Sequence, residues 1–230
     1  MKTLKLFAAA VAAAGLLAVP AHASTVFMFK SGAGPIDTPT GNFVFDCGSV
    51  GSDYCTDDDA AGFTYSKDGV TFTAVGLASG SPATLVQDII PENSGLGVFS
   101  AGESQTGPED QVQASAGESI KFTFTSNVNL TNVEFNSGAD RDCSAASQPE
   151  GPCGFFDLYV DGGLVGTFEA VDLFTLAFFG SVFEFVAITA GGGFASAQFE
   201  ISDVPVPAAL PLLLAGLAGL GFASRRRKTA

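Results

Sequence analysis

The side chains best suited to chemistry in this sequence are carboxylates, which gather in short groups beside cysteines. One group stands beside Cys55 and the other just before Cys143; their members are Asp53, Asp57, Asp58, Asp59, Asp140 and Asp142. Calcium prefers six to eight oxygen ligands and often takes them from loops. Neither group has the D-x-[DN]-x-[DN]-G spacing of an EF-hand loop. The sequence therefore suggests one structural Ca²⁺ in one of the groups, with solvated acidic loops as the alternative.

Other catalytic chemistry is poorly represented. The only histidine, His22, lies in an N-terminal segment that we expect to be removed, so imidazole catalysis and histidine metal sites are not expected. Tryptophan is absent, which argues against a Trp-lined carbohydrate platform but not against polar sugar recognition. A hydrolase that uses two nearby carboxylates stays open as an alternative. We expect the protein not to be an enzyme.

The cysteines predict disulfides. Cys47, Cys55, Cys143 and Cys153 make an even set in a chain that we expect to be exported. Among the three possible connectivities we favour Cys47–Cys55 with Cys143–Cys153, because each pair closes a short polar loop. A zinc site is disfavoured because neither pair has the CxxC spacing.

The N-terminus has the pattern of a secretory signal. Lys2 and Lys5 precede an apolar run that ends in the small-x-small sequence Ala21-His22-Ala23, so residues 1–23 read as a signal peptide cleaved after Ala23. An uncleaved membrane helix is the alternative. All 24 acidic residues but only four of the ten basic ones lie between Ser24 and Asp203, so this segment carries a net charge of about −20. Such a surface repels nucleic acid and anionic lipid.

Residues 24–203 read as one all-β domain. Short runs rich in Phe, Val and Thr recur at roughly ten-residue spacing, separated by Gly, Asn, Asp and Pro. Ser119–Thr125 is the clearest example, since Ile120, Phe122 and Phe124 alternate with polar residues. The segments Ser119–Thr125 and Thr131–Asn136 are predicted as separate strands, Cys47–Ala60 as a surface loop, and Asp172–Phe179 as either a helical turn or a buried strand. The pattern favours an antiparallel β-sandwich, jelly-roll-like.

The tail, residues 204–230, has three parts. Val204, Pro205, Val206, Pro207 and Ala208 form a proline step, an apolar run follows to Ala223, and four basic residues, Arg225, Arg226, Arg227 and Lys228, come next. With the proline step the apolar run approaches the length of a single C-terminal transmembrane helix. The basic cluster would stay in the cytoplasm, which places the domain outside. Two roles are open for the tail: an anchor that is later removed, or a plain single-span membrane anchor that stays in place.

This tripartite tail resembles the PEP-CTERM sorting signals of Gram-negative bacteria. It is most similar to the variant whose motif reads VPLPA, from which it departs by Val206 in place of Leu. The resemblance implies an exosortase as partner, transient membrane anchoring, and delivery to the cell surface, outer membrane or extracellular matrix. We therefore expect a non-enzymatic matrix or surface protein, with exopolysaccharide as a further partner and no nucleic acid. A carbohydrate- or calcium-binding module is the alternative.

Overall fold

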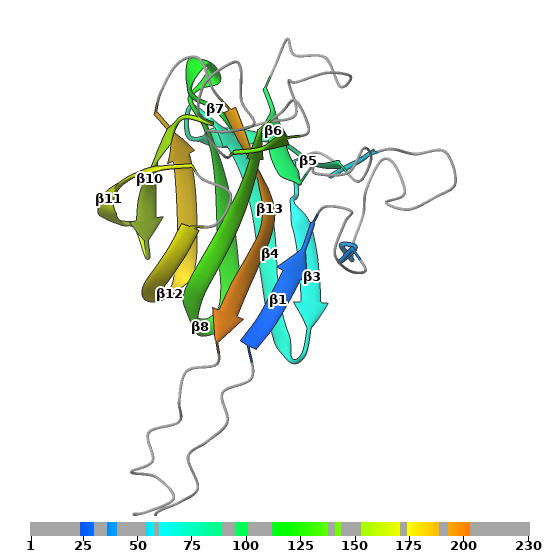
Figure 1. Ribbon diagram of the computed structural model, residues 1–230. Coiled ribbons are helices and arrows are strands. Elements are labelled where there is room, and N and C mark those ends of the chain that lie inside the picture. Colours follow the sequence, from blue (N-terminus) through cyan, green and yellow to red (C-terminus); the bar gives the residue numbers. More distant parts are fainter. Residues whose placement is uncertain are drawn as a thin grey trace, which may run out of the picture. The chain divides into compact units, whose positions relative to one another are not determined.

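The computed structural model describes residues 24–29, 36–40, 54–57, 60–88, 95–100, 112–137, 141–143, 153–170, 174–188 and 193–202 (Figure 1). Within these ranges the chain forms thirteen strands and one short 3₁₀ helix, η1. Their bounds in chain order are β1 Ser24–Met28, β2 Tyr54–Thr56, β3 Phe63–Lys67, β4 Val70–Ala78, β5 Ser81–Asp88, β6 Leu96–Phe99, β7 Val112–Gln113, η1 Ala114–Ala116, β8 Glu118–Ser137, β9 Arg141–Asp142, β10 Phe155–Val160, β11 Gly163–Glu169, β12 Phe174–Ala187 and β13 Gly193–Ser202. All of the pairings between strands are antiparallel, which confirms the all-β prediction. Residues Ser24–Ser202 form one compact unit.

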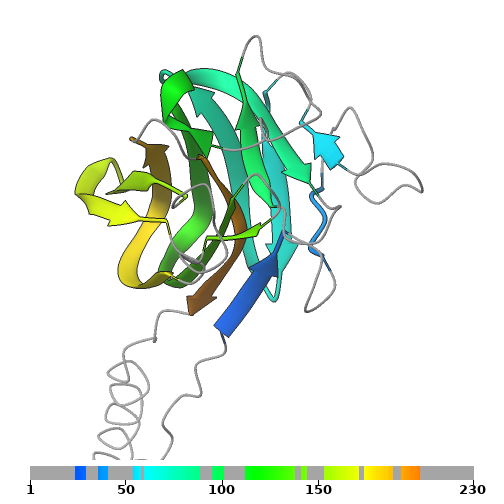
Figure 2. The same ribbon diagram turned by 45° about the horizontal axis from the view of Figure 1, so that its top comes forward.

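The strands form one continuous sheet with the order β1-β13-β6-β5-β4-β8-β12-β10-β11. β13 pairs with β8 as well as with β6, so the hydrogen-bonded path β13-β6-β5-β4-β8 returns to its start. The sheet consequently folds over, and β1 and β13 face β4 from the opposite layer (Figures 1 and 2). Phe27 of β1 contacts Phe72 of β4 with ring centroids 4.8 Å apart, although these strands are not paired.

The core between the layers is built from phenylalanine. Alternation places one face of each strand inside, as the period of two requires. The largest fully buried side chains are Tyr65, Phe27, Phe29, Phe63, Phe72, Phe122, Phe135, Phe156, Phe183, Phe185 and Phe199. Phe199 of β13 lies at the centre, with its ring 4.9 Å from that of Phe72 and 5.0 Å from that of Phe122. Packed aromatic pairs of this kind add stability beyond the area that they bury.

β8 corrects the prediction of two separate strands over Ser119–Thr125 and Thr131–Asn136. It is continuous over 20 residues. Its first half pairs with β4 and its second half with β13, while β12 follows it along the other edge. The buried positions change from Val128 and Leu130 to Val133 and Phe135, an irregularity that lets the strand bend from one layer to the other. The sequence instead predicts two strands, because the polar residues Ser126 and Asn127 resemble a turn between them.

Two further predicted segments contain strand. Tyr54–Thr56 lies within the predicted loop Cys47–Ala60, yet it forms β2 on the edge of β5, and Cys55, Thr56 and Asp57 are buried. The ambiguous segment Asp172–Phe179 is strand from Phe174 onward, as the first part of β12. The jelly-roll connectivity stays a prediction. In the part of the chain that the structure describes, there is no helix with the length and apolarity needed to cross a membrane, and the expected tail helix lies outside that part.

Candidate processing junction

The two ends of the domain meet on neighbouring strands. β1 and β13 run antiparallel side by side (Figure 1). Their register sets Ser24 opposite Ser202 and Thr25 opposite Ile201. Ser24 is the first residue after the predicted signal cleavage point, and Ser202 is the last residue of β13. Paired residues in antiparallel strands lie about 4.5–5.5 Å apart between their Cα atoms. The points at which the two terminal segments join the domain are therefore adjacent.

β8 holds the other edge of β13 near the same end. Ser202 lies opposite Asn129, and the Asn129 Nδ2 donates a hydrogen bond of 3.2 Å to the Ser202 Oγ. Thr131 Oγ1 donates to the Glu200 carbonyl oxygen at 3.1 Å. Asn132 Nδ2 donates to the Glu200 Oε2 at 2.7 Å, a bond strengthened by the carboxylate charge. Side-chain hydrogen bonds thus support the last residues of β13 in addition to the backbone ladder.

Packing secures the same residues from the inside. Phe199 and Ile201 point into the core and are each 1% exposed. Burying a large apolar side chain contributes roughly 1.5–3 kcal/mol. These residues therefore anchor β13 to the core within three positions of its end.

A polar network secures β1. The Lys67 Nζ donates hydrogen bonds of 2.7 Å to the Val26 carbonyl oxygen and to the Asp37 Oδ2, and it lies 5.9 Å from the centre of the Phe27 ring. The Met28 backbone N–H also donates to the Asp37 Oδ2, at 2.9 Å. Lys67 and Asp37 are partly exposed, so this ion pair positions β1 more than it stabilises the fold.

Tyr65 and Gln87 extend this network into the core. The Tyr65 hydroxyl donates to the Gln87 Oε1 at 3.0 Å, and the Gln87 Nε2 donates to the carbonyl oxygens of Phe29 and Asp37 at 3.1 Å. Burial of the hydroxyl, and secondarily the negative charge of Asp37, raise the pKa of Tyr65 well above its usual 10.0. Tyr65 therefore stays protonated and keeps its donor role over the neutral pH range.

The segment that follows Ser202 contains a recognisable sorting signal. Residues 203–228 match the PEP-CTERM protein-sorting motif. The chain has a PEP-CTERM tail. Such a motif implies an exported protein that is processed by an exosortase and located at the cell surface. The match covers the tail alone. No curated protein and no solved structure matches the chain.

The predicted sorting residues lie outside the described part of the chain, so their prediction stays as it was made. This applies to Val204, Pro205, Val206, Pro207 and Ala208, and to the basic residues Arg225, Arg226, Arg227 and Lys228. It applies equally to the signal peptide.

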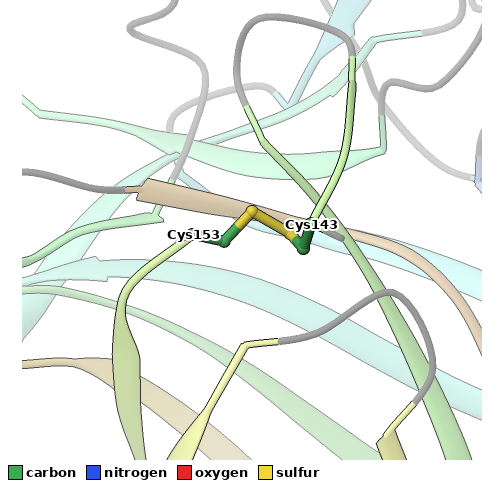
Figure 3. Close-up of a disulfide and its surroundings, with 2 residues drawn as sticks. All are labelled: Cys143 and Cys153. Atoms are coloured by element: carbon green, nitrogen blue, oxygen red, sulfur yellow. A yellow bond between two sulfur atoms is a disulfide. The ribbon is translucent and has the colours of Figure 1, made fainter. Parts of the chain in front are cut away.

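One predicted disulfide is confirmed. Cys143, which follows β9, and Cys153, which precedes β10, are joined through their sulfur atoms with their Cα atoms 5.5 Å apart (Figure 3). Both cysteines are buried. Cys47 lies outside the described residues, so the Cys47–Cys55 pairing stays a prediction.

Among the predicted calcium ligands, Asp57 is the one whose side chain the structure describes. It is buried, and its carboxylate accepts hydrogen bonds from the Gly62 N–H at 2.6 Å and the Leu85 N–H at 2.8 Å. These bonds connect the segment after β2 to β5. Among the residues that the structure describes, no cluster of three or more metal-ligating side chains is present. The side chains of Asp53, Asp58, Asp59, Asp140 and Asp142 lie outside the description, so the calcium site stays a prediction.

Sequence reasoning did not identify the residues that brace the junction. Most of their hydrogen bonds join partners 30 to 73 positions apart in the chain, and these residues are Asn129, Thr131, Asn132, Asp37 and Lys67. Asp37 also accepts from the Met28 N–H, nine positions away. The polar residues Asn129, Thr131 and Asn132 were a weak signal at most, because polar residues in a strand normally indicate only a solvated face.

Proposed function

We propose that this chain is a non-enzymatic surface or extracellular-matrix protein. Its tail, of the VPLPA type, holds the exported domain at the membrane until an exosortase removes it. The signal peptide is removed at the other end. The observation that carries this proposal is the Ser24–Ser202 pairing, together with a sorting motif that begins at the next residue.

The junction suits removal of both terminal segments. Every backbone and side-chain bond described above for β1 and β13 lies within residues 24–202. Cutting the chain before Ser24 and beyond Ser202 therefore leaves the sheet and its core intact. The end of β13 is paired on both edges and packed against the core, which keeps residues up to Ser202 out of a protease cleft, because such a cleft must take its substrate as an accessible peptide. The cleavage consequently falls beyond Ser202, in the segment that contains the motif.

The non-enzymatic assignment rests on composition and on how two of the described carboxylates, Asp37 and Asp57, are used. No histidine remains after Ala23. The carboxylates of Asp57 and Asp37 are occupied by backbone N–H groups or by Lys67. These side chains brace the fold and are not presented to a substrate.

The test is a comparison of a host that contains an exosortase with its exosortase deletion. Mass spectrometry of the exported protein should find the C-terminus without Arg225–Lys228 in the first host and with it in the second. Pro205→Ala combined with Pro207→Ala should block removal, whereas Pro82→Ala, an exposed proline in β5, should not. A mature protein that retains Arg225–Lys228 in the exosortase-containing host would refute the proposal.

A further inference from the structure

The outward face of β3, β4 and β8 carries a regular array of hydroxyl groups. Each strand presents two hydroxyl residues that flank one buried aromatic residue, in the segments Thr64-Tyr65-Ser66, Thr71-Phe72-Thr73 and Thr123-Phe124-Thr125. Because Tyr65, Phe72 and Phe124 point into the core, their neighbours point to the other face of the sheet.

Strand register aligns these residues into two rows. Thr64 lies opposite Thr73, and Thr73 opposite Thr123. Thr40 extends this first row, because it forms an isolated bridge with Thr64. Ser66 lies opposite Thr71 in the second row, and the Thr125 Oγ1 donates to the Thr71 carbonyl oxygen at 3.3 Å. The backbone positions of these residues therefore repeat about every 4.8 Å across the strands and about every 6.7 Å along them.

Hydrogen bonds hold part of this hydroxyl array in place. The hydroxyls of Thr64 and Thr73 are 3.3 Å apart, and those of Ser66 and Thr71 are 2.8 Å apart. Threonine has a restricted χ1 angle in any case. The array is also accessible, since Thr40, Ser66, Thr123 and Thr125 are exposed. A partner would thus meet preorganised groups, which lowers the entropic cost of binding.

The chemistry of the hydroxyl array selects the partner class. Its seven residues carry no charge, although the surrounding domain carries a net charge of about −20. Anionic polymers would be repelled by that domain. Protein interfaces usually depend on aromatic or Arg anchor residues, and the array has none. Without carboxylates the array also lacks the ligands that hold calcium.

A neutral polysaccharide is the partner class that remains, and its chemistry matches the hydroxyl array. Its hydroxyls both donate and accept hydrogen bonds, as those of Thr and Ser do. The threonine methyl groups offer small apolar contacts to the C–H faces of sugar rings. An extended sugar chain also repeats at a length close to the distance between strands. We propose that the hydroxyl array binds a neutral polysaccharide; this inference rests on the proposed function, to which it adds the class of matrix partner.

The test uses the full chain in mild detergent, so that it does not depend on tail removal. Binding is measured to particles of cellulose, dextran, agarose and starch, with the acidic polymer alginate as the charged comparison. We expect retention on at least one neutral polysaccharide and none on alginate. Thr73→Val with Thr123→Val removes two facing hydroxyls while it preserves side-chain shape, and should weaken binding about tenfold or more.

The matched control is Thr175→Val, at an exposed threonine of β12 outside the array, which should bind like the wild type. Unchanged melting temperatures establish that all variants fold. The inference fails if no neutral polysaccharide retains the wild type, or if the double variant binds as tightly. A dimer that the double variant dissociates, without polysaccharide binding, would also overturn it and identify a second copy as the occupant. None of these results bears on C-terminal processing, which the mass spectra report separately.

Discussion

Ser24 and Ser202 lie opposite each other on β1 and β13, so the residue that follows the predicted signal cleavage point pairs with the residue before the sorting motif. The last strand of the domain is also the one that β1, β6, β7 and β8 all pair with. The domain therefore cannot complete its sheet until residue 202 has been exported, and the strand pairings described here all lie within residues 24–202.

Phe199 should be among the most important side chains for stability. Its ring lies within 6 Å of the rings of Phe27, Phe29, Phe72, Phe122 and Phe124. Phe199→Ala should lower the free energy of unfolding by about 3–5 kcal/mol, because it leaves a cavity at the centre of the core. Urea unfolding measures the loss. Phe179→Ala, at a side chain that is 55% exposed, is the control and should change stability by about 0.5 kcal/mol or less.

Tyr65 should make the fold sensitive to alkali. Its pKa is raised in the folded state, so its contribution to stability is present below pH 10.0 and is lost as the pH rises above that value, where the unfolded chain releases the proton. Tyr65→Phe should be less stable at neutral pH, by about 1 kcal/mol, through loss of the hydrogen bond to Gln87. It should also lose less stability than the wild type on going to alkaline pH.

Unfolding curves at neutral pH and above pH 10.0 test this expectation. Tyr159→Phe, at a partly exposed tyrosine, is the control for removal of a tyrosine hydroxyl outside the core. An equal alkaline loss in wild type and Tyr65→Phe would contradict the role given to the buried hydroxyl.

Removal of the confirmed disulfide should destabilise the domain without unfolding it. Cys143 and Cys153 are ten positions apart, and closing a loop of this size restricts the unfolded chain by about 2–3 kcal/mol. Cys143→Ala with Cys153→Ala should lower the free energy of unfolding by about that amount. A reducing agent can no longer act on this disulfide in the double variant. Any further loss of stability on reduction would therefore come from another disulfide.

The calcium prediction concerns the acidic groups whose side chains lie mostly outside the described residues. If one of them binds Ca²⁺, about 1 mM calcium should raise the melting temperature of the metal-stripped protein. Asp58→Asn with Asp59→Asn, and separately Asp140→Asn, would show which group is responsible. An unchanged melting temperature on calcium addition would leave solvated acidic loops as the correct reading.

Features that depend on neighbouring residues were predicted correctly, whereas features that depend on distant partners in the chain were not. The segment Ser119–Thr125 was predicted as strand and lies within β8, because alternation of apolar and polar residues is a local feature. β8 was divided in two and β2 was taken for loop, because their conformations depend on partners elsewhere in the chain. Asp57 was named as a candidate calcium ligand on composition, and its hydrogen bonds from two backbone N–H groups became visible only in the fold.

The sequence by itself determined the sorting motif, the all-β class and the strong negative charge of the domain, because each of these is written in adjacent residues or in composition. Tertiary structure alone decided that Ser24 meets Ser202, that Phe199 lies at the centre of the core, and that three separate Thr/Ser pairs form one hydroxyl array. These relationships depend on strand register between segments up to 178 positions apart, and register is set by packing of the whole sheet, which no local stretch of sequence encodes.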